Sequence, residues 1–121
     1  MPKRILLLDD DLLVLRSLEK ALQKDGYEVM PFDDQGKALI AIRKKKFDLI
    51  LTDIRMPQKN GVELAQDIQK ELINAGKKDL PVIFITGYVG DEMKLQAPLV
   101  GETLYKPVDV TVLLSTIRDY L

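Results

Sequence analysis

The sequence predicts an α/β fold in which a single parallel sheet of five strands carries helices on both faces. Short apolar runs alternate five times with segments whose apolar residues recur at helical spacing, and the connections between them are short. Such alternation predicts parallel strands joined by right-handed crossovers. We find no linker, repeat or low-complexity segment, so one domain is expected to fill residues 1–121.

The five expected strands are short runs that end in polar or turn-forming residues. Three of them are almost wholly apolar and predict strands buried on both faces. The second contains Pro31, which fits an edge strand better than a central one because proline cannot donate to a ladder. The expected strands cover residues 5–8, 27–32, 49–51, 80–85 and 102–105.

The expected helices follow capping residues and end at glycine or proline. Either Asp10 or Asp11 can cap the first helix, the pair Asp33–Asp34 precedes the second, and Asp109 can cap the last. In the last helix, the inner side is expected to hold Val112, Leu113, Ile117 and Leu121. The third helix follows the turn-forming Asn60-Gly61 and stops at Gly76. The fourth helix is expected to be short, covering residues 91–97, and to be broken at Pro98.

Composition excludes several classes of chemistry. The chain has 46% hydrophobic and 31% charged residues and a net charge of −1, which gives no sign of a nucleic-acid or membrane-surface binder. It contains neither cysteine nor histidine, so disulfides, zinc–thiolate sites and imidazole bases are absent. No stretch resembles a signal sequence or a membrane span, and we expect a cytoplasmic protein.

Polar side chains follow four of the expected strands at their carboxyl ends. They are Asp9 with Asp10, then Asp53, Thr86 and Lys106. In a parallel sheet these ends share one edge, where α/β proteins place their ligands. Carboxylates at close range repel unless a cation neutralises them, and Mg²⁺ is the natural choice because it accepts one or two carboxylates together with phosphate oxygens.

An acid cluster, a metal ion, a lysine and a hydroxyl together predict a site for a transferred phosphoryl group. Asp53 would be the nucleophile that forms an aspartyl phosphate. Thr86 supplies a hydroxyl donor, and Gly87 beside it leaves room for the incoming group. Lys106 adds a fixed positive charge without competing as a metal ligand.

These motifs, over the whole chain, resemble those of a response-regulator receiver domain of two-component signalling. The matching motifs are the acid pair after the first strand, Asp53-x-x-Met56-Pro57, Thr86-Gly87 and Lys106-Pro107. The resemblance implies a flavodoxin-like strand order 2-1-3-4-5. It also implies that Asp53 takes the phosphoryl group from a phosphohistidine of a sensor kinase or phosphotransfer protein.

Further roles come only from this resemblance. Asp10 would be the principal acid on the metal, with Asp9 assisting, Asp53 also coordinating and the backbone carbonyl of Arg55 as a further ligand. The ion would be Mg²⁺, with Mn²⁺ as an alternative. Thr86 and Lys106 would bind phosphoryl oxygens and couple phosphorylation to a conformational shift, and the Lys106–Pro107 bond would be cis.

The chain departs from the family pattern in two places. Receivers usually carry a switch aromatic three residues before the lysine, but Thr103 stands there, and Tyr105 on the same strand face is a candidate substitute. The segment from Gly87 to Gly101 is short, which leaves the output step and any dimer through that face open. A monomer or weak dimer is expected.

Access to the phosphoryl group depends on the residues around it. Gly87 leaves room, whereas Arg55 and Tyr88 lie two residues after Asp53 and Thr86 and could shield an acyl phosphate from water. The alternative is that both side chains point into solvent.

Two other readings compete with the receiver. One is a Mg²⁺-dependent phosphatase resembling the haloacid-dehalogenase superfamily, with Asp9-Asp10-Asp11 as its Asp-x-Asp motif. Against it, Leu13 occupies a position where threonine or valine is wanted, and the chain has no room for a cap domain. The other is a pseudo-receiver that only binds partners, which the intact Asp53 and Lys106 argue against. The cognate kinase, the output partner and the length of the natural chain are left open.

Overall fold

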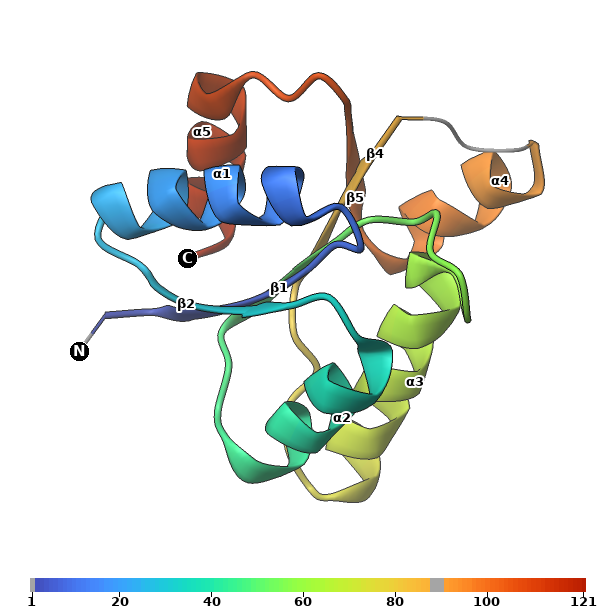
Figure 1. Ribbon diagram of the computed structural model, residues 1–121. Coiled ribbons are helices and arrows are strands. Elements are labelled where there is room, and N and C mark those ends of the chain that lie inside the picture. Colours follow the sequence, from blue (N-terminus) through green and yellow to red (C-terminus); the bar gives the residue numbers. More distant parts are fainter. Residues whose placement is uncertain (1, 88–90) are drawn as a thin grey trace.

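The computed structural model describes residues 2–87 and 91–121, and its strands form one parallel sheet in the order β2-β1-β3-β4-β5 (Figure 1). The order and direction confirm the predicted fold, and Pro31 lies in the edge strand β2, paired with Leu7. The strands are β1 Arg4–Leu8, β2 Glu28–Phe32, β3 Leu49–Thr52, β4 Val82–Thr86 and β5 Glu102–Tyr105.

Five helices alternate with the strands and cover both faces of the sheet. Figure 1 shows α1 and α5 on one face and α2 and α3 on the other, with α4 beside α3. The helices are α1 Leu12–Lys24, α2 Gln35–Lys44, α3 Gly61–Asn74, α4 Asp91–Val100 and α5 Val110–Tyr120.

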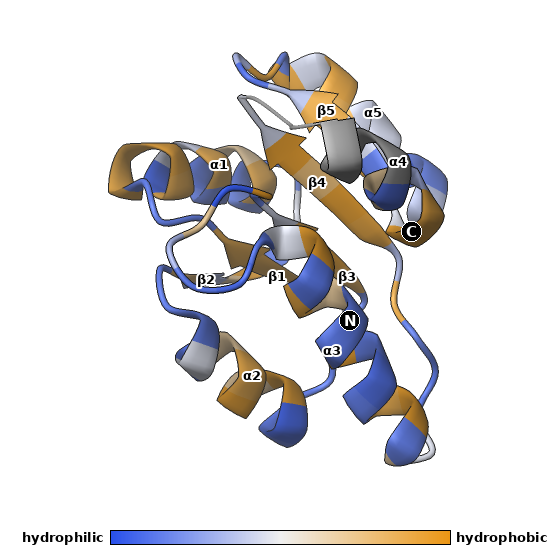
Figure 2. Ribbon diagram, turned by 90° about the vertical axis from the view of Figure 1, so that its right-hand side faces the viewer, coloured by the Kyte–Doolittle hydropathy of each residue, from blue (hydrophilic) through white to orange (hydrophobic). Residues whose placement is uncertain are grey.

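Each face of the sheet has its own hydrophobic core, because successive strand residues point to opposite sides. Ile5 and Leu7 pack towards α1 and α5, whereas Leu6 and Leu8 pack towards α2 and α3. All four are essentially inaccessible to solvent. In Figure 2 strand β4 is hydrophobic throughout, whereas the helices alternate between hydrophobic and hydrophilic residues. The resulting rigid sheet fixes the positions of its strand ends.

The helices begin at capping residues whose side chains accept backbone N–H groups. Asp11, not Asp10, caps α1, with Oδ1 accepting from Leu13 N at 3.0 Å and Val14 N at 3.4 Å. Asp109 caps α5 in the same way. Because Asp11 caps the helix, Asp10 remains available at the carboxyl edge of the sheet.

Two sequence-based expectations about helices are wrong. The fourth helix is not broken at Pro98 but runs to Val100, and Gly101 N still donates to Ala97 O at 2.9 Å. Proline removes one donor only, and in the last turn the remaining bonds suffice. In α5, Val112 does not face the core: it is 49% exposed, whereas Leu113 and Ile117 are fully buried.

Within residues 2–87 and 91–121, none of the helices combines the length and the apolar character required to cross a lipid bilayer.

Candidate functional site

The backbone ladder continues past the strand ends and aligns the predicted site residues at one edge of the sheet. Asp53 N donates to Leu8 O at 3.0 Å, which sets Asp53 beside the first strand's end. Lys106 N donates to Thr86 O at 2.9 Å, which holds the end of β5 against the end of β4. Side chains from the ends of β1, β3, β4 and β5 therefore share this edge.

Three carboxylates meet there. Asp9, Asp10 and Asp53 each offer a carboxylate oxygen, and these atoms all lie within 4.8 Å of one another. Asp9 and Asp53 are 1% and 6% exposed, whereas Asp10 is exposed to solvent. The cluster is therefore open to ions and ligands on the Asp10 side and closed on the protein side.

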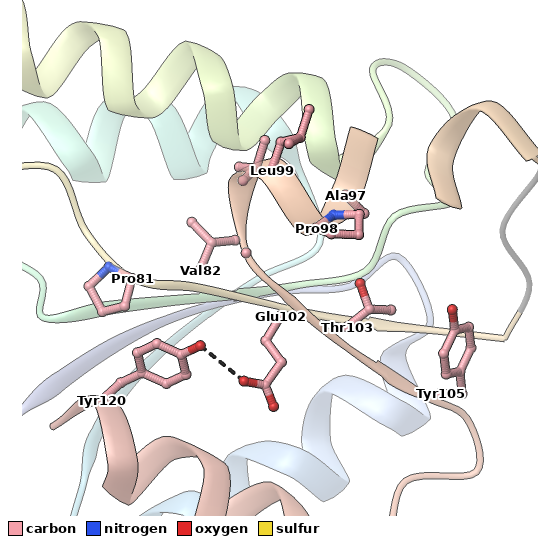
Figure 3. A pocket seen from close by; sticks show the side chains of 11 residues that line it. Pro81, Val82, Ala97, Pro98, Leu99, Glu102, Thr103, Tyr105 and Tyr120 are labelled. Atoms are coloured by element: carbon pink, nitrogen blue, oxygen red, sulfur yellow. Dashed lines mark hydrogen bonds between the residues drawn. The ribbon is translucent and has the colours of Figure 1, made fainter. Parts of the chain in front are cut away.

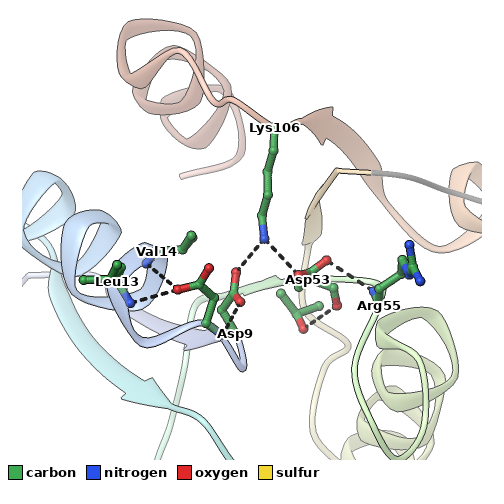
Figure 4. Close-up of polar contacts among 8 residues, drawn as sticks. Asp9, Leu13, Val14, Asp53, Arg55 and Lys106 are labelled. Carbon is green, nitrogen blue, oxygen red and sulfur yellow. Dashed lines mark hydrogen bonds and ion pairs between the residues drawn. The ribbon is translucent and has the colours of Figure 1, made fainter.

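Lys106 bridges the two buried acids. Its Nζ lies 3.0 Å from Asp53 Oδ2 and 3.2 Å from Asp9 Oδ2 (Figure 4). Burial disfavours the ammonium form, but the hydrogen bond to Asp53 and the charges of Asp9 and Asp53 together outweigh burial and raise the pKa of Lys106. The lysine therefore stays protonated at neutral pH.

The surroundings of Asp9 disfavour its ionised form. Burial raises the pKa of its carboxyl and the charge of Asp53 adds to the effect, although the Asp11 N–H bond and Lys106 oppose it. Asp11 N donates to Asp9 Oδ1 at 2.9 Å. One ammonium does not fully offset three carboxylates, so the donor set suits a hard divalent cation that prefers oxygen ligands, such as Mg²⁺.

Both the carboxylate and the backbone carbonyl of Asp53 are held by neighbouring groups. Arg55 N donates to Asp53 Oδ1 at 3.2 Å, and the Thr52 hydroxyl donates to the Asp53 carbonyl at 3.0 Å. Gly61 lies so close that a Cβ on it would stand 1.9 Å from the Asp53 carbonyl oxygen. Sequence reasoning identified Gly61 only as a turn former and missed this contact, because the contact depends on how α3 docks against the end of β3.

The other predicted site residues are placed as follows. Thr86 is fully buried and Gly87 is exposed, and the Lys106–Pro107 peptide bond is cis. Arg55 is exposed, with its N–H directed at Asp53. Tyr88 lies outside the described residues.

The two candidate switch residues lie along β5. Tyr105 is the register partner of Thr86, and Thr103 is the partner of Phe84. Both line a groove of about 580 Å³ that also includes Pro98 (Figure 3). Tyr105 is 55% exposed and Thr103 is half-buried. Tyr105 therefore lies at the surface, on the strand that pairs with β4, directly opposite Thr86.

Comparisons with known proteins agree with this geometry. CpdR, a response regulator receiver protein of Brucella abortus, is 37% identical over 98% of this chain and 97% of its own. PilH of Pseudomonas aeruginosa is 32% identical over 98% and 97%. The transcriptional regulator GlrR of Escherichia coli is 34% identical over 99% of this chain, which spans only 26% of GlrR.

Solved structures show the same fold. The Vibrio cholerae chemotaxis protein CheY4 superposes with a TM-score of 0.87 at 28% identity, over the full length of both chains. The response regulator TrrA of Thermotoga maritima, solved in complex with Mg²⁺ and BeF, gives 0.84 at 30% identity over 98% of this chain and 99% of its own. The family model of the response regulator receiver domain matches residues 5–118. The chain therefore belongs to the response regulator receiver domain family, a signalling module of two-component systems.

Proposed function

We propose that this chain is a phosphoacceptor: Asp53 receives a phosphoryl group from a phosphohistidine in a Mg²⁺-dependent reaction, and the domain then changes conformation to signal. The observation that carries the proposal is the meeting of three carboxylates within 4.8 Å, with the Lys106 ammonium 3.0 Å from Asp53. Receiver domains of response regulators act with histidine kinases or phosphotransfer proteins, which supply such a donor.

Asp53 is suited to act as the nucleophile. Its Oδ1 is held by the Arg55 N–H, so the carboxylate has one fixed orientation. In the transfer, a carboxylate oxygen of Asp53 forms a bond to phosphorus while the bond between phosphorus and the donor imidazole nitrogen breaks. The electron pair of the broken bond stays on that nitrogen. The product is an aspartyl phosphate.

Lys106 and Thr86 would receive the charge of the transferred group. Lys106 bridges Asp9 and Asp53, so its ammonium already lies beside the carboxylate that would carry the phosphoryl group and could bind a phosphoryl oxygen with little movement. Thr86 ends the neighbouring strand and carries a hydroxyl donor. Phosphoryl transfer needs positioning and charge neutralisation more than covalent chemistry, and these two groups provide both.

Asp9, Asp10 and Asp53, with the Arg55 carbonyl, are the groups that would hold Mg²⁺. The fit rests on three carboxylate oxygens within 4.8 Å of one another, two of them from the buried residues Asp9 and Asp53, with one lysine ammonium beside them. When bound, the ion neutralises this charge and that of the incoming phosphoryl oxygens. Mn²⁺ prefers similar oxygen ligands and would serve as a substitute.

We propose that the domain assists only its own phosphorylation and dephosphorylation and turns over no separate substrate. Signalling would then pass from Thr86 to its register partner Tyr105 and the groove that Tyr105 lines. In this proposal the exposed Tyr105 takes the role of the switch aromatic, and Thr103, which stands at the usual position of that aromatic, does not.

The test is incubation of the purified chain with a radiolabelled small phosphoryl donor, with Mg²⁺ or with a chelator. We expect wild type to retain label up to one equivalent only when Mg²⁺ is present, and Asp53→Asn to retain none. Steady release of phosphate with little retained label would instead indicate a phosphatase. Equal labelling in the chelator would overturn the dependence on the metal.

A further inference from the structure

Gln35, the first residue of α2, forms a two-point clamp on a distant loop. Its Nε2 donates to the Lys59 carbonyl at 2.5 Å, and Lys59 N donates back to Gln35 Oε1 at 3.4 Å. The residue is 8% exposed, although glutamine is usually found at the surface. One buried amide therefore ties together segments 24 residues apart in sequence.

The gripped loop, residues 53–60, carries the proposed phosphoacceptor. At its start, Arg55 N donates to the Asp53 carboxylate at 3.2 Å. At its end, Gly61 N donates to Ile54 O at 2.8 Å, which closes the base of the loop. Between these anchors, the outer part of the loop is fastened to the body of the domain by the Gln35 clamp on the Lys59 backbone and by the ion pair between the exposed Lys59 ammonium and Asp67 of α3.

The clamp also shapes the space beside the acid cluster. A cleft of about 110 Å³ adjoins the cluster through Asp10, and its walls come from the three loops that follow β1, β2 and β3. Gln35 joins the second of these loops to the third. The lining residues are Asp10, Asp33, Asp34, Gln35, Met56, Pro57 and Gln58.

The same kind of clamp occurs at the opposite end of the sheet. Gln69 in α3 donates through Nε2 to the Leu80 carbonyl and accepts Leu80 N at 2.8 Å. It fastens the connection that leads into β4, away from the acids that follow β1 and β3. Gln69 thus offers a matched control: an equivalent pair of hydrogen bonds from a glutamine side chain to the backbone, made to Leu80 and not to the phosphoacceptor loop.

We propose that Gln35 is a positioning residue for the phosphoacceptor site. By fixing Lys59 it holds the loop so that the Arg55 backbone and the Asp53 carboxylate stay aimed at the cation and the incoming phosphoryl group. This inference rests on the proposed function and adds to it a side chain that touches neither metal nor phosphate. Residues that hydrogen-bond to the groups around a metal ligand matter because a small displacement of a reacting atom lowers the reaction rate or the metal affinity.

The experiment compares Gln35→Met with Gln69→Met, since methionine keeps most of the volume and removes both hydrogen bonds. Amide hydrogen exchange over residues 55–60, the Mg²⁺ dissociation constant from an NMR titration, and the rate of labelling by acetyl phosphate are measured. For Gln35→Met we expect faster exchange in that loop and Mg²⁺ affinity lower by about 10-fold, the lower end for residues that orient metal ligands. Labelling should slow at subsaturating Mg²⁺ and recover in part when Mg²⁺ is raised.

Gln69→Met should lose similar stability while keeping wild-type Mg²⁺ affinity and labelling. Equal behaviour of the two variants in affinity and loop exchange would overturn the role of Gln35. If wild type itself takes up no label, the proposed phosphoacceptor function fails, whereas the exchange and Mg²⁺ measurements still decide on the clamp. Should either methionine variant fail to fold, the pair Gln35→Ala and Gln69→Ala replaces it, with the same outcomes deciding.

Discussion

Gly61→Ala is a small change that acts directly on the backbone of the proposed nucleophile. The added Cβ would stand 1.9 Å from the Asp53 carbonyl oxygen, 2.9 Å from its carbonyl carbon and 3.1 Å from the Ile54 Cα. These are backbone atoms of the segment that follows β3, so no flexible side chain can move aside. To reach even 3.0 Å from the carbonyl oxygen, α3 and the residue Asp53 must separate by at least 1.1 Å.

That separation sets the expected magnitudes. Overpacking of this kind costs about 1–3 kcal/mol of stability, which an ordinary domain tolerates. A displacement of about 1 Å at a reacting group can slow its chemistry by roughly 100-fold. We therefore expect Gly61→Ala to fold but to be labelled about 100-fold more slowly than wild type, because the Asp53 carboxylate moves relative to Lys106.

The assay is the time course of labelling at saturating Mg²⁺, with urea unfolding to establish stability. Gly101→Ala is the matched control, because its Cβ would stand 2.2 Å from the Val82 carbonyl oxygen at the far end of β4. It should be destabilised to a similar degree and be labelled at close to the wild-type rate. Equal slowing in both variants would refute the reasoning, since loss of stability alone would then explain the effect.

Three further changes test the charges and a cap. Lys106→Met removes the ammonium between two buried acids. Urea unfolding without metal should show a free energy of unfolding lower by about 1.5–3 kcal/mol, and saturating Mg²⁺ should reduce this loss. An unchanged free energy of unfolding would show that the two ion pairs do not stabilise the fold. Burial raises the pKa of Asp9 in the folded protein, so the protein is more stable when this carboxyl is protonated. This contribution to the folding stability is fully present below pH 3.8, the pKa of Asp9 in the unfolded chain, and is lost as pH rises through the higher pKa of the folded state. In a chelator, Asp9→Asn should therefore be more stable than wild type at pH 7, and the difference should vanish below pH 3.8; a difference independent of pH would argue against it. Asp109→Ala removes the cap of α5 and should cost about 1 kcal/mol in thermal unfolding without altering the labelling rate, and a slowed rate would tie α5 to the chemistry.

The strands and the strand-end residues were predictable because they follow from local patterns and one topological rule, whereas the sheet order was implied by the resemblance to receiver domains. Apolar runs bounded by polar residues marked the strands, and parallel strands place their carboxyl ends at one edge. Asp9, Asp53 and Lys106 therefore had to come close, and the structure brings them within hydrogen-bonding distance.

The remaining features depend on contacts between elements that are distant in sequence. Gln35 reads as an ordinary first-turn polar residue, and only the approach of Lys59 makes it a buried clamp. Gly61 acquires its significance from the docking of α3 on Asp53. Val112 fits the helical spacing, but its neighbour Leu113 takes the buried position with Ile117, which leaves Val112 on the exposed side of α5.

The most direct test of the central claim is the position of the covalent phosphoryl group. Protein labelled in Mg²⁺ and then reduced with borohydride converts an aspartyl phosphate to homoserine, which tandem mass spectrometry locates. The account predicts homoserine at position 53, in an amount that follows the retained label. Homoserine at Asp9 or Asp10, or stable label with no homoserine at all, would contradict it.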